Sequence, residues 1–410
     1  MERDDRQGLL NSRSNRPSPM VTNLFEIGPL RLRERSLKTV KAYISRERLR
    51  YNALQIKQQC GTAVKLCAVV KADGYGHGAR RVVSCLNDLA DFFAVSTIEE
   101  AEQIYPFVQG KPILVTCPLF GGMDPQLLRL AQIRGFQGTI CSVGALEVVD
   151  ALLEKSLPRL NLQVKIDTGM GRIGCRWEEG LLLVQSVMRN PKFCLRGIYT
   201  HFATADEEDL SFTRRQLRQF ETFLEQSGLD REKSVVKHAS NTSAALRLPE
   251  SRFDMVRCGI GIYGYRNYIS SLEPECVIRP VLRVEAPLVQ VKRLRAGHSC
   301  GYGRTFVASR EMLIGIVPVG YADGIFRCLS NRAVMRRGQY NLPIVGRISM
   351  DYTIVDVSGL PGAREGMAVT VIEDEPDSPC NAATLAKCAE TIPYEILTAI
   401  GNRIKRELVD

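Results

Sequence analysis

Histidine and tryptophan are scarce in this chain, which has four histidines and one tryptophan among 410 residues. The histidines are not spaced as a metal-binding pair, and no two cysteines form a CxxC motif, so no zinc site or disulfide framework is indicated. No apolar run approaches the ~18 residues that a transmembrane helix needs. The polar residues 1–20 lack the apolar core of a secretory signal. We therefore expect a cytoplasmic protein without a metal.

The thirteen cysteines are scattered, and several lie in apolar runs, among them Cys67, Cys141 and Cys258. Buried, reduced thiols explain this pattern better than disulfides do. The net charge is +10, and residues 1–50 contribute +6 of it, with twelve Lys and Arg against six Asp and Glu. Because no aromatic residues interleave these charges, a solvated tail and one basic helix face are favoured over nucleic-acid or membrane binding.

Short apolar runs alternate with helical spacing over the first two thirds of the chain, which predicts a (β/α)8 barrel rather than an open doubly wound sheet. The predicted strands are 64–70, 91–95, 112–116, 138–141, 161–166, 195–200, 234–238 and 255–260. The predicted helices are 46–59, 77–90, 97–104, 125–134, 144–155, 177–189 and 209–227.

From about residue 280 the pattern becomes mostly β, which predicts a separate C-terminal domain. Its predicted β-rich segments are 281–292, 313–318, 333–337, 343–348, 352–356 and 368–372, followed by a helix at 382–390. We divide the chain into a disordered basic tail (1–36), a strand expected to join the C-terminal domain (37–46), the barrel (47–275) and the β domain (276–410). The fold class predicted is thus α/β, a TIM-like barrel followed by a mostly-β domain.

Residues 68–78, AVVKADGYGHG, bring Lys71 from an apolar strand to a glycine-rich turn. A lysine that is desolvated at a strand end shifts its pKa downward and can form a Schiff base with an aldehyde cofactor such as pyridoxal phosphate. A strand lysine that merely precedes a turn would look the same in isolation.

This run resembles the cofactor-lysine signature of the alanine racemases, and five further segments match that family in its order. The resemblance covers roughly residues 37–410 and implies a barrel that binds pyridoxal 5'-phosphate plus a β domain. It also implies racemisation of L-alanine and D-alanine, which supplies D-alanine for peptidoglycan, by a homodimer whose active sites are shared. A racemase of serine or another small amino acid, or a non-catalytic pyridoxal-phosphate carrier, are the alternatives.

The resemblance implies two catalytic bases, Lys71 and Tyr302, the latter in the segment GYGRT at 301–305 and reaching the lysine from the partner subunit. It implies cofactor contacts by Arg257, in VRCGIGIYG at 256–264, and by Arg172, in VKIDTGMGRIG at 164–174. A guanidinium at the pyridine nitrogen is a permanent donor, which favours racemisation over reactions that need a stronger electron sink.

The remaining site residues are also carried over from the resemblance. His201 would link Tyr302 to Arg257, and Lys165 matches a lysine that is often carbamylated. The cofactor phosphate would be bound by Tyr75, Thr242, Gly259, Ile260 and Tyr394. Arg172 and the backbone of Met350 would bind the substrate carboxylate, and Tyr321 would narrow the entrance.

Overall fold

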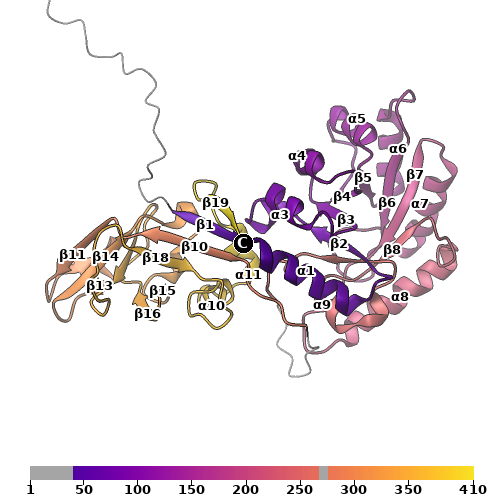
Figure 1. Cartoon of the computed structure of the whole chain (residues 1–410). Coiled ribbons are helices and arrows are strands. Elements are labelled where there is room, and N and C mark those ends of the chain that lie inside the picture. The colour runs from indigo at the N-terminus through magenta and orange to yellow at the C-terminus, as the bar shows by residue number, and fades with distance from the viewer. Residues whose placement is uncertain (1–39, 267–275) are drawn as a thin grey trace, which may run out of the picture. The chain divides into compact units, whose positions relative to one another are not determined.

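The computed structural model describes residues 40–266 and 276–410, which form a parallel barrel and a mostly-β C-terminal domain (Figure 1). This arrangement confirms the predicted fold class. The tail predicted for residues 1–36 lies outside the described residues, and the predicted domain boundaries stay predictions.

Eight parallel strands form the barrel, in the order β8-β7-β6-β5-β4-β3-β2-β9. Their apolar residues are buried, and β3, for example, exposes none of its four side chains. Two backbone hydrogen bonds nearly close the ring between β8 and β9, from Asp254 N to Lys237 O (3.1 Å) and from Arg257 N to Ser240 O (3.0 Å). The strands are β2 (Lys65–Val69), β3 (Phe92–Val95), β4 (Ile113–Pro118), β5 (Gln137–Ile140), β6 (Leu160–Lys165), β7 (Phe193–Tyr199), β8 (Val236–His238) and β9 (Met255–Cys258).

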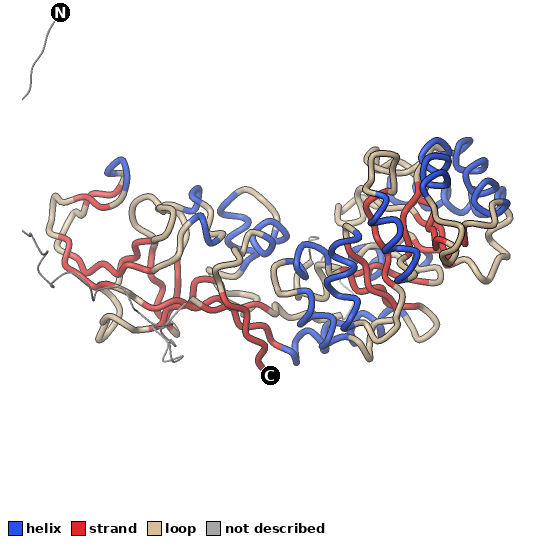
Figure 2. Tube along the Cα trace, turned by 90° about the horizontal axis from the view of Figure 1, so that it is seen from above, coloured by secondary structure: helices blue, strands red, loops and turns tan. Residues whose placement is uncertain are grey.

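Helices surround the barrel strands on the outside (Figure 2). Local sequence sets their ends: α5 begins after Asp124, whose carboxylate accepts from Gln126 N, and it ends at Gly135 with φ of 70°. The helices are α1 (Arg46–Cys60), α3 (Ala79–Leu86), α4 (Ile98–Ile104), α5 (Pro125–Arg134), α6 (Val143–Leu152), α7 (Trp177–Arg189), α8 (Ser211–Ser227) and α9 (Thr242–Arg247).

The C-terminal domain is built on a six-stranded sheet, ordered β16-β15-β18-β10-β1-β19, together with a three-stranded sheet, β11-β14-β17. Strand β1 (Lys41–Ser45) is antiparallel to β10 and parallel to β19, so both ends of the described chain lie in this sheet. The other elements are β10 (Leu282–Pro287), β11 (Gln290–Leu294), β12 (Ser299–Cys300), β13 (Phe306–Val307), β14 (Met312–Val317), β15 (Val334–Arg337), β16 (Tyr340–Pro343), β17 (Thr353–Asp356), β18 (Ala368–Ile372), α10 (Ala382–Ala389), α11 (Pro393–Thr398) and β19 (Lys405–Val409).

One predicted β-rich segment, 343–348, is wrong: the strand there is β16, which ends at Pro343. A hairpin at Gly338 (φ 54°) pairs Tyr340 with Arg337, and Gly346 (φ 73°) turns the chain soon afterwards. These two turns shift the strand toward the N-terminus, because left-handed backbone at a glycine ends regular pairing.

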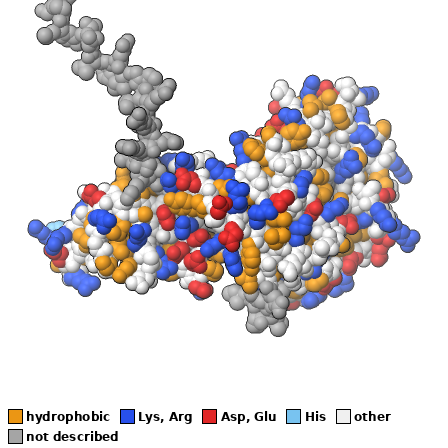
Figure 3. Space-filling model, viewed as in Figure 1, with side chains coloured by type: hydrophobic (Ala, Val, Ile, Leu, Met, Phe, Trp, Pro, Cys, Tyr) orange, Lys and Arg blue, Asp and Glu red, His pale blue; other side chains and the backbone are white. Residues whose placement is uncertain are grey.

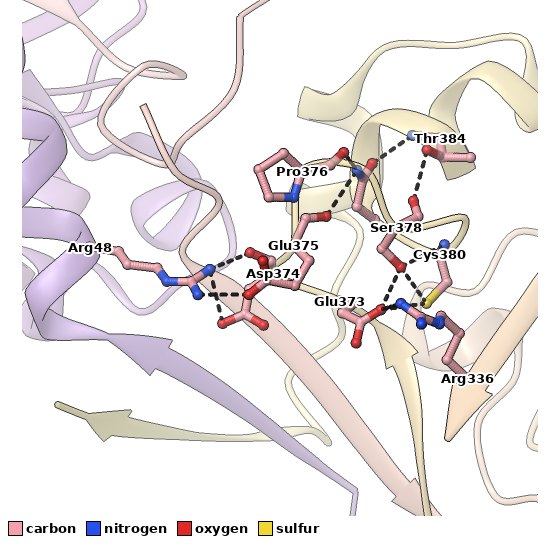
Figure 4. Close-up of polar contacts among 10 residues, drawn as sticks. Arg48, Arg336, Glu373, Asp374, Glu375, Pro376, Ser378, Cys380 and Thr384 are labelled. Atoms are coloured by element: carbon pink, nitrogen blue, oxygen red, sulfur yellow. Dashed lines mark hydrogen bonds and ion pairs between the residues drawn. The ribbon is translucent and has the colours of Figure 1, made fainter. Parts of the chain in front are cut away.

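An ion-pair cluster joins α1 to the C-terminal domain (Figure 4). The Arg48 guanidinium lies 2.9 Å from Glu375 Oε1 and donates to the carbonyl of Pro280 at 3.1 Å. Beside it, Arg336 Nη1 lies 2.7 Å from Glu373 Oε2. Arg48 thus contacts both Pro280, just before β10, and the loop after β18. These contacts connect the start of the barrel to the C-terminal domain.

Basic and acidic side chains intermingle on the face shown in Figure 3, and they form no single-sign patch across several elements there. Among the described residues, no helix is long and apolar enough to cross a membrane. All thirteen cysteines are free thiols.

Candidate active site

Lys71 begins a tight left-handed turn, α2 (Lys71–Tyr75), directly after barrel strand β2. Ala72, Asp73 and Tyr75 have φ values of 52°, 51° and 53°. This conformation costs about 1–2 kcal/mol at each non-glycine residue, so surrounding contacts must maintain it. Ala72 N donates to the Glu100 carboxylate at 2.8 Å, and the Asp73 carboxylate accepts from the backbone N–H of α3. The turn therefore presents the Lys71 amine at the carboxyl end of the barrel.

Four cations converge at this end of the barrel around His201. Burial, then Arg172, lowers the pKa of Lys71. Burial, then Arg257 and Arg172, lowers the pKa of Lys165 to about 8. Burial and then these same four cations, Arg257 first, hold the pKa of His201 well below its usual range. The structure thus gathers these five predicted residues in one electropositive site that would accept an anion.

Two carboxylates act on these cations, Glu100 on Lys71 and Asp167 on Lys165. Asp167, after β6, accepts hydrogen bonds from the backbone N–H groups of Gly169 (2.9 Å) and Met170 (2.8 Å). These hydrogen bonds shape the loop that carries Arg172. Two carboxylates against four cations leave positive charge in excess.

Arg257 is the most constrained cation, because its guanidinium is buried and donates four hydrogen bonds. Two go to the carbonyls of Thr200 (2.8 Å) and Ala239 (3.0 Å). The other two go to Nδ1 of His238 (2.7 Å) and Nδ1 of His201 (3.2 Å). Sequence analysis missed His238, although this histidine ends β8, the strand beside β9 and its Arg257.

A second group of predicted residues forms a small cradle next to Lys71. A Cβ on Gly259 would lie 2.4 Å from the Tyr75 hydroxyl, so only glycine lets the phenol approach the backbone. Gly259 N also donates to Thr242 Oγ1 at 3.3 Å, and Ile260 follows directly. The ring of Tyr394, from α11, lies 5.8 Å from that of Tyr75. Hydroxyls and backbone N–H groups in this arrangement suit a phosphate.

Three further predicted residues lie, like Tyr394, in the C-terminal domain, but on segments of it other than α11. Tyr302, on the one-turn helix η3 (Tyr302–Arg304), is 69% exposed and lines a cavity of about 630 Å³ with Arg347 and Ser349. Tyr321 N donates to Ser349 O at 3.1 Å, and Ala322 N donates to Met350 O at 3.1 Å, so these segments are adjacent. We call these three residues the C-terminal group, and the five residues around His201 together with the cradle the barrel group. Among the described residues, the backbone hydrogen bonds of Tyr321 and Met350 go to segments of the C-terminal domain.

Comparison with known proteins identifies the family. The model of the alanine racemase N-terminal domain matches residues 44–267, and that of the alanine racemase C-terminal domain matches residues 281–408. The chain belongs to the alanine racemase family. The predicted resemblance is therefore confirmed.

Members of this family align with the chain almost end to end. An alanine racemase of Streptococcus pneumoniae is 37% identical over 372 residues, which are 90% of this chain and 98% of that protein. The crystal structure of alanine racemase from E. faecalis has 32% identity and a TM-score of 0.82, covering 90% and 98% of the two chains. The Bartonella henselae alanine racemase, described with covalently bound pyridoxal phosphate, has 28% identity and a TM-score of 0.78, covering 90% and 99%.

Within this alanine racemase-family chain, the two domains carry different acid–base groups. The barrel holds a desolvated amine, Lys71, among cations, and the C-terminal domain displays an exposed phenol, Tyr302. An amine and a phenol can each accept or donate a proton when their surroundings adjust their pKa values.

Proposed function

We propose that this chain racemises alanine, interconverting the L and D enantiomers with pyridoxal 5'-phosphate as its cofactor. The observation that carries the proposal is the position of Lys71, a desolvated amine on a strained turn, among cations and next to a cradle of hydroxyls and backbone N–H groups. The cofactor presents an aldehyde, a phosphate and a phenolic oxygen, and the barrel group offers a matching partner for each. When bound, the cofactor supplies an electron sink for the α-carbon.

The barrel residues divide into binding and proton-transfer roles. Lys71 holds the cofactor covalently and moves the α-proton on one face of the substrate. Arg257 donates to the pyridine nitrogen as a permanent cation, and Arg172 binds the phenolic oxygen and the substrate carboxylate. His201 connects Arg257 to the second base. The phosphate is held by the cradle, which consists of Tyr75, Thr242, Gly259, Ile260 and Tyr394.

Tyr302 is the base on the other face, contributed by a second copy of the chain. Its exposure, and its place in the C-terminal group away from Lys71, support a homodimer in which each site takes residues from both subunits. Tyr321 would narrow the entrance and the backbone N–H of Met350 would bind the substrate carboxylate. We keep the predicted division of the chain, with the barrel at 47–275 as the cofactor domain and 276–410 as the domain that completes the partner's site.

Lys165 is proposed to carry a carbamate. Its amine lies close to Arg257 and Arg172, and its pKa is lowered to about 8, so a reactive neutral form is available near neutral pH. Carbon dioxide would add to the neutral amine, which loses a proton and becomes an anion. That anion would then offset the two guanidinium groups.

The product D-alanine would serve peptidoglycan synthesis in the cytoplasm, a location with which thirteen free thiols agree. The width of the site near Tyr321 and Met350 decides whether serine is also accepted.

Incubation of the purified protein with L-alanine in D2O tests this function. We expect loss of optical rotation together with deuterium at the α-carbon, and an absorbance band of protein-bound pyridoxal phosphate that Lys71→Ala removes. A normal band without activity on alanine would exclude alanine as substrate and favour the two alternatives, a racemase of another small amino acid or a non-catalytic carrier. A chain that binds no cofactor would overturn the proposal.

A further inference from the structure

A line of buried side chains runs through the barrel interior, away from the site and toward its opposite mouth. Arg257 Nη1 lies 2.7 Å from His238 Nδ1, and His238 Nε2 lies 2.6 Å from Gln163 Oε1. Gln163 Nε2 then lies 2.6 Å from Gln137 Oε1. His238 and Gln163 have no exposed surface, and Gln137 is 7% exposed. The four residues come from β9, β8, β6 and β5.

Arg257 determines the direction of each hydrogen bond along this line, because its guanidinium has no acceptor. A guanidinium can only donate, so His238 must accept at Nδ1 and carry its proton on Nε2. That Nε2–H needs an acceptor, which only the oxygen of the Gln163 amide provides. The amide nitrogen of Gln163 must then donate to Gln137. All the bonds are therefore satisfied with one proton arrangement.

The surrounding packing is shaped for this line. The Tyr199 ring stacks on His238 with centroids 4.8 Å apart and an angle of 8°, which fixes the imidazole plane. A Cβ on Gly197 would lie 2.9 Å from the Gln163 amide, so the glycine in β7 leaves room for that side chain. Gln137 lines a cavity of about 430 Å³ at the amino-terminal mouth of the barrel, where the line ends.

We propose that Gln163 is a positioning residue for racemisation. By accepting from His238 Nε2–H, it keeps His238 Nδ1 as an acceptor for Arg257 and so fixes the guanidinium that faces the cofactor. The proposal rests on the proposed function, because it assigns Arg257 to the cofactor ring. Without the Gln163 oxygen, the buried Nε2–H of His238 would lose its acceptor, so the tautomer with the proton on Nδ1, which meets Arg257 donor to donor, would become less unfavourable relative to the present one.

Gln163→Met tests the proposal, because it keeps the length of the side chain and removes the strong acceptor. Gln132→Met is the matched control: Gln132 is also a buried amide (3% exposed), but it donates to the carbonyls of Glu154 and Pro158 outside the barrel. We expect Gln163→Met to lower kcat for alanine about tenfold with little change in KM, because Arg257 is assigned to the cofactor rather than to the substrate. The control should leave both values near those of the parent.

The second readout is the protonation of His238, measured by NMR of the holoenzyme labelled with ¹⁵N in its four histidines, with His238→Asn for assignment. The parent and the control should show a proton on Nε2 alone, and Gln163→Met should show a mixture or a shift to Nδ1. A parent with the proton on Nδ1, or on both nitrogens, overturns the proposal even if the variant does not fold. Unchanged protonation and kcat in a folded Gln163→Met protein also overturn it.

This design separates the inference from the proposed function. If the parent does not racemise alanine, the proposed function fails, whereas the His238 spectra still decide whether Gln163 controls the tautomer.

Discussion

Most of the Tyr302 side chain is exposed on a one-turn helix, so few contacts within its own chain constrain it. If it is the second base, Tyr302→Phe should lower racemisation at least about a hundredfold, the usual contribution of a general base. Binding of the cofactor should persist, because the phosphate cradle is in the other group. Activity is measured by loss of rotation, and cofactor binding by absorbance.

Tyr352 provides the control for this variant, since it lines the same cavity and is 50% exposed. Tyr352→Phe should retain most of the parent activity. Equal losses in both variants would indicate that the phenols act through the shape of the cavity, and they would remove Tyr302 from the proton transfer.

Lys165 makes the stability of the cofactor-free protein depend on pH. Its pKa falls from 10.5 to about 8 on folding, first because of burial and then because of Arg257. Between these values the unfolded chain binds more protons than the folded chain, so this residue makes stability rise with pH. Below about pH 8, Lys165 is charged in both the folded and the unfolded chain, and its burial then lowers the stability by the full amount.

Lys165→Met should therefore stabilise the cofactor-free protein by about 3 kcal/mol at pH 7 but by only about 1 kcal/mol at pH 9.5. Denaturant unfolding of both proteins at the two pH values, in buffers free of carbon dioxide, measures this difference. The same difference at both values would contradict a lowered pKa in the folded state.

Individual site residues were predictable when they lie in short motifs, as Lys71 and Arg257 do. The partners of those residues were not, because His238 and Gln163 are 75 positions apart in sequence and meet only across the barrel. A buried glutamine in an apolar strand gives no local sign of its partner. The roles proposed for the predicted residues stay predictions that the experiments above test.

At the scale of elements, runs of apolar residues predicted the barrel strands well, because parallel strands are buried on both faces. Helices α5 and α7 have the predicted bounds, 125–134 and 177–189. The short helices α9 and α11 and the strand β19 were missed. Each has six residues or fewer, too few to show a period, and contacts distant in sequence hold them.

Residues of the C-terminal domain hold the turn after Lys71 in place through contacts at Gly76. Its carbonyl accepts from Arg406 Nε at 3.1 Å, and a Cβ on Gly76 would lie 2.1 Å from the carbonyl oxygen of Leu397 in α11. Because that contact is with backbone, the Lys71 turn and α11 would have to separate to admit any side chain.

Gly76→Ala should therefore destabilise the protein by about 3 kcal/mol or more, the sum of a left-handed backbone cost and overpacking. Gly228→Ala is the control, because Gly228 at the end of α8 also has a left-handed backbone (φ 70°, ψ 8°) but no atom within 4 Å of an added Cβ, and it should cost about 1–2 kcal/mol. Denaturant unfolding gives both values. Equal losses would show that the contact between the turn and α11 adds nothing to the backbone cost.

The position of the two groups of residues matters most at the scale of the whole molecule. The barrel group and the C-terminal group belong to one chain, yet the backbone hydrogen bonds of Tyr321 and Met350 stay within the C-terminal domain, and Tyr302 is 69% exposed. If each site is assembled from two copies, it needs an intact barrel group from one chain and an intact C-terminal group from the other. This requirement distinguishes a shared site from a site closed by domain movement.

Mixing two inactive variants decides between these possibilities. A dimer of one Lys71→Ala chain and one Tyr302→Phe chain contains one intact site if the sites are shared, because each chain supplies the group that the other lacks. Unfolding and refolding the variants together makes half of the dimers mixed, so activity should return to roughly a quarter of the parent value. Refolding each variant alone is the control. No recovery in a preparation whose mixed dimers are verified by affinity tags would place Lys71 and Tyr302 of a working site in the same chain.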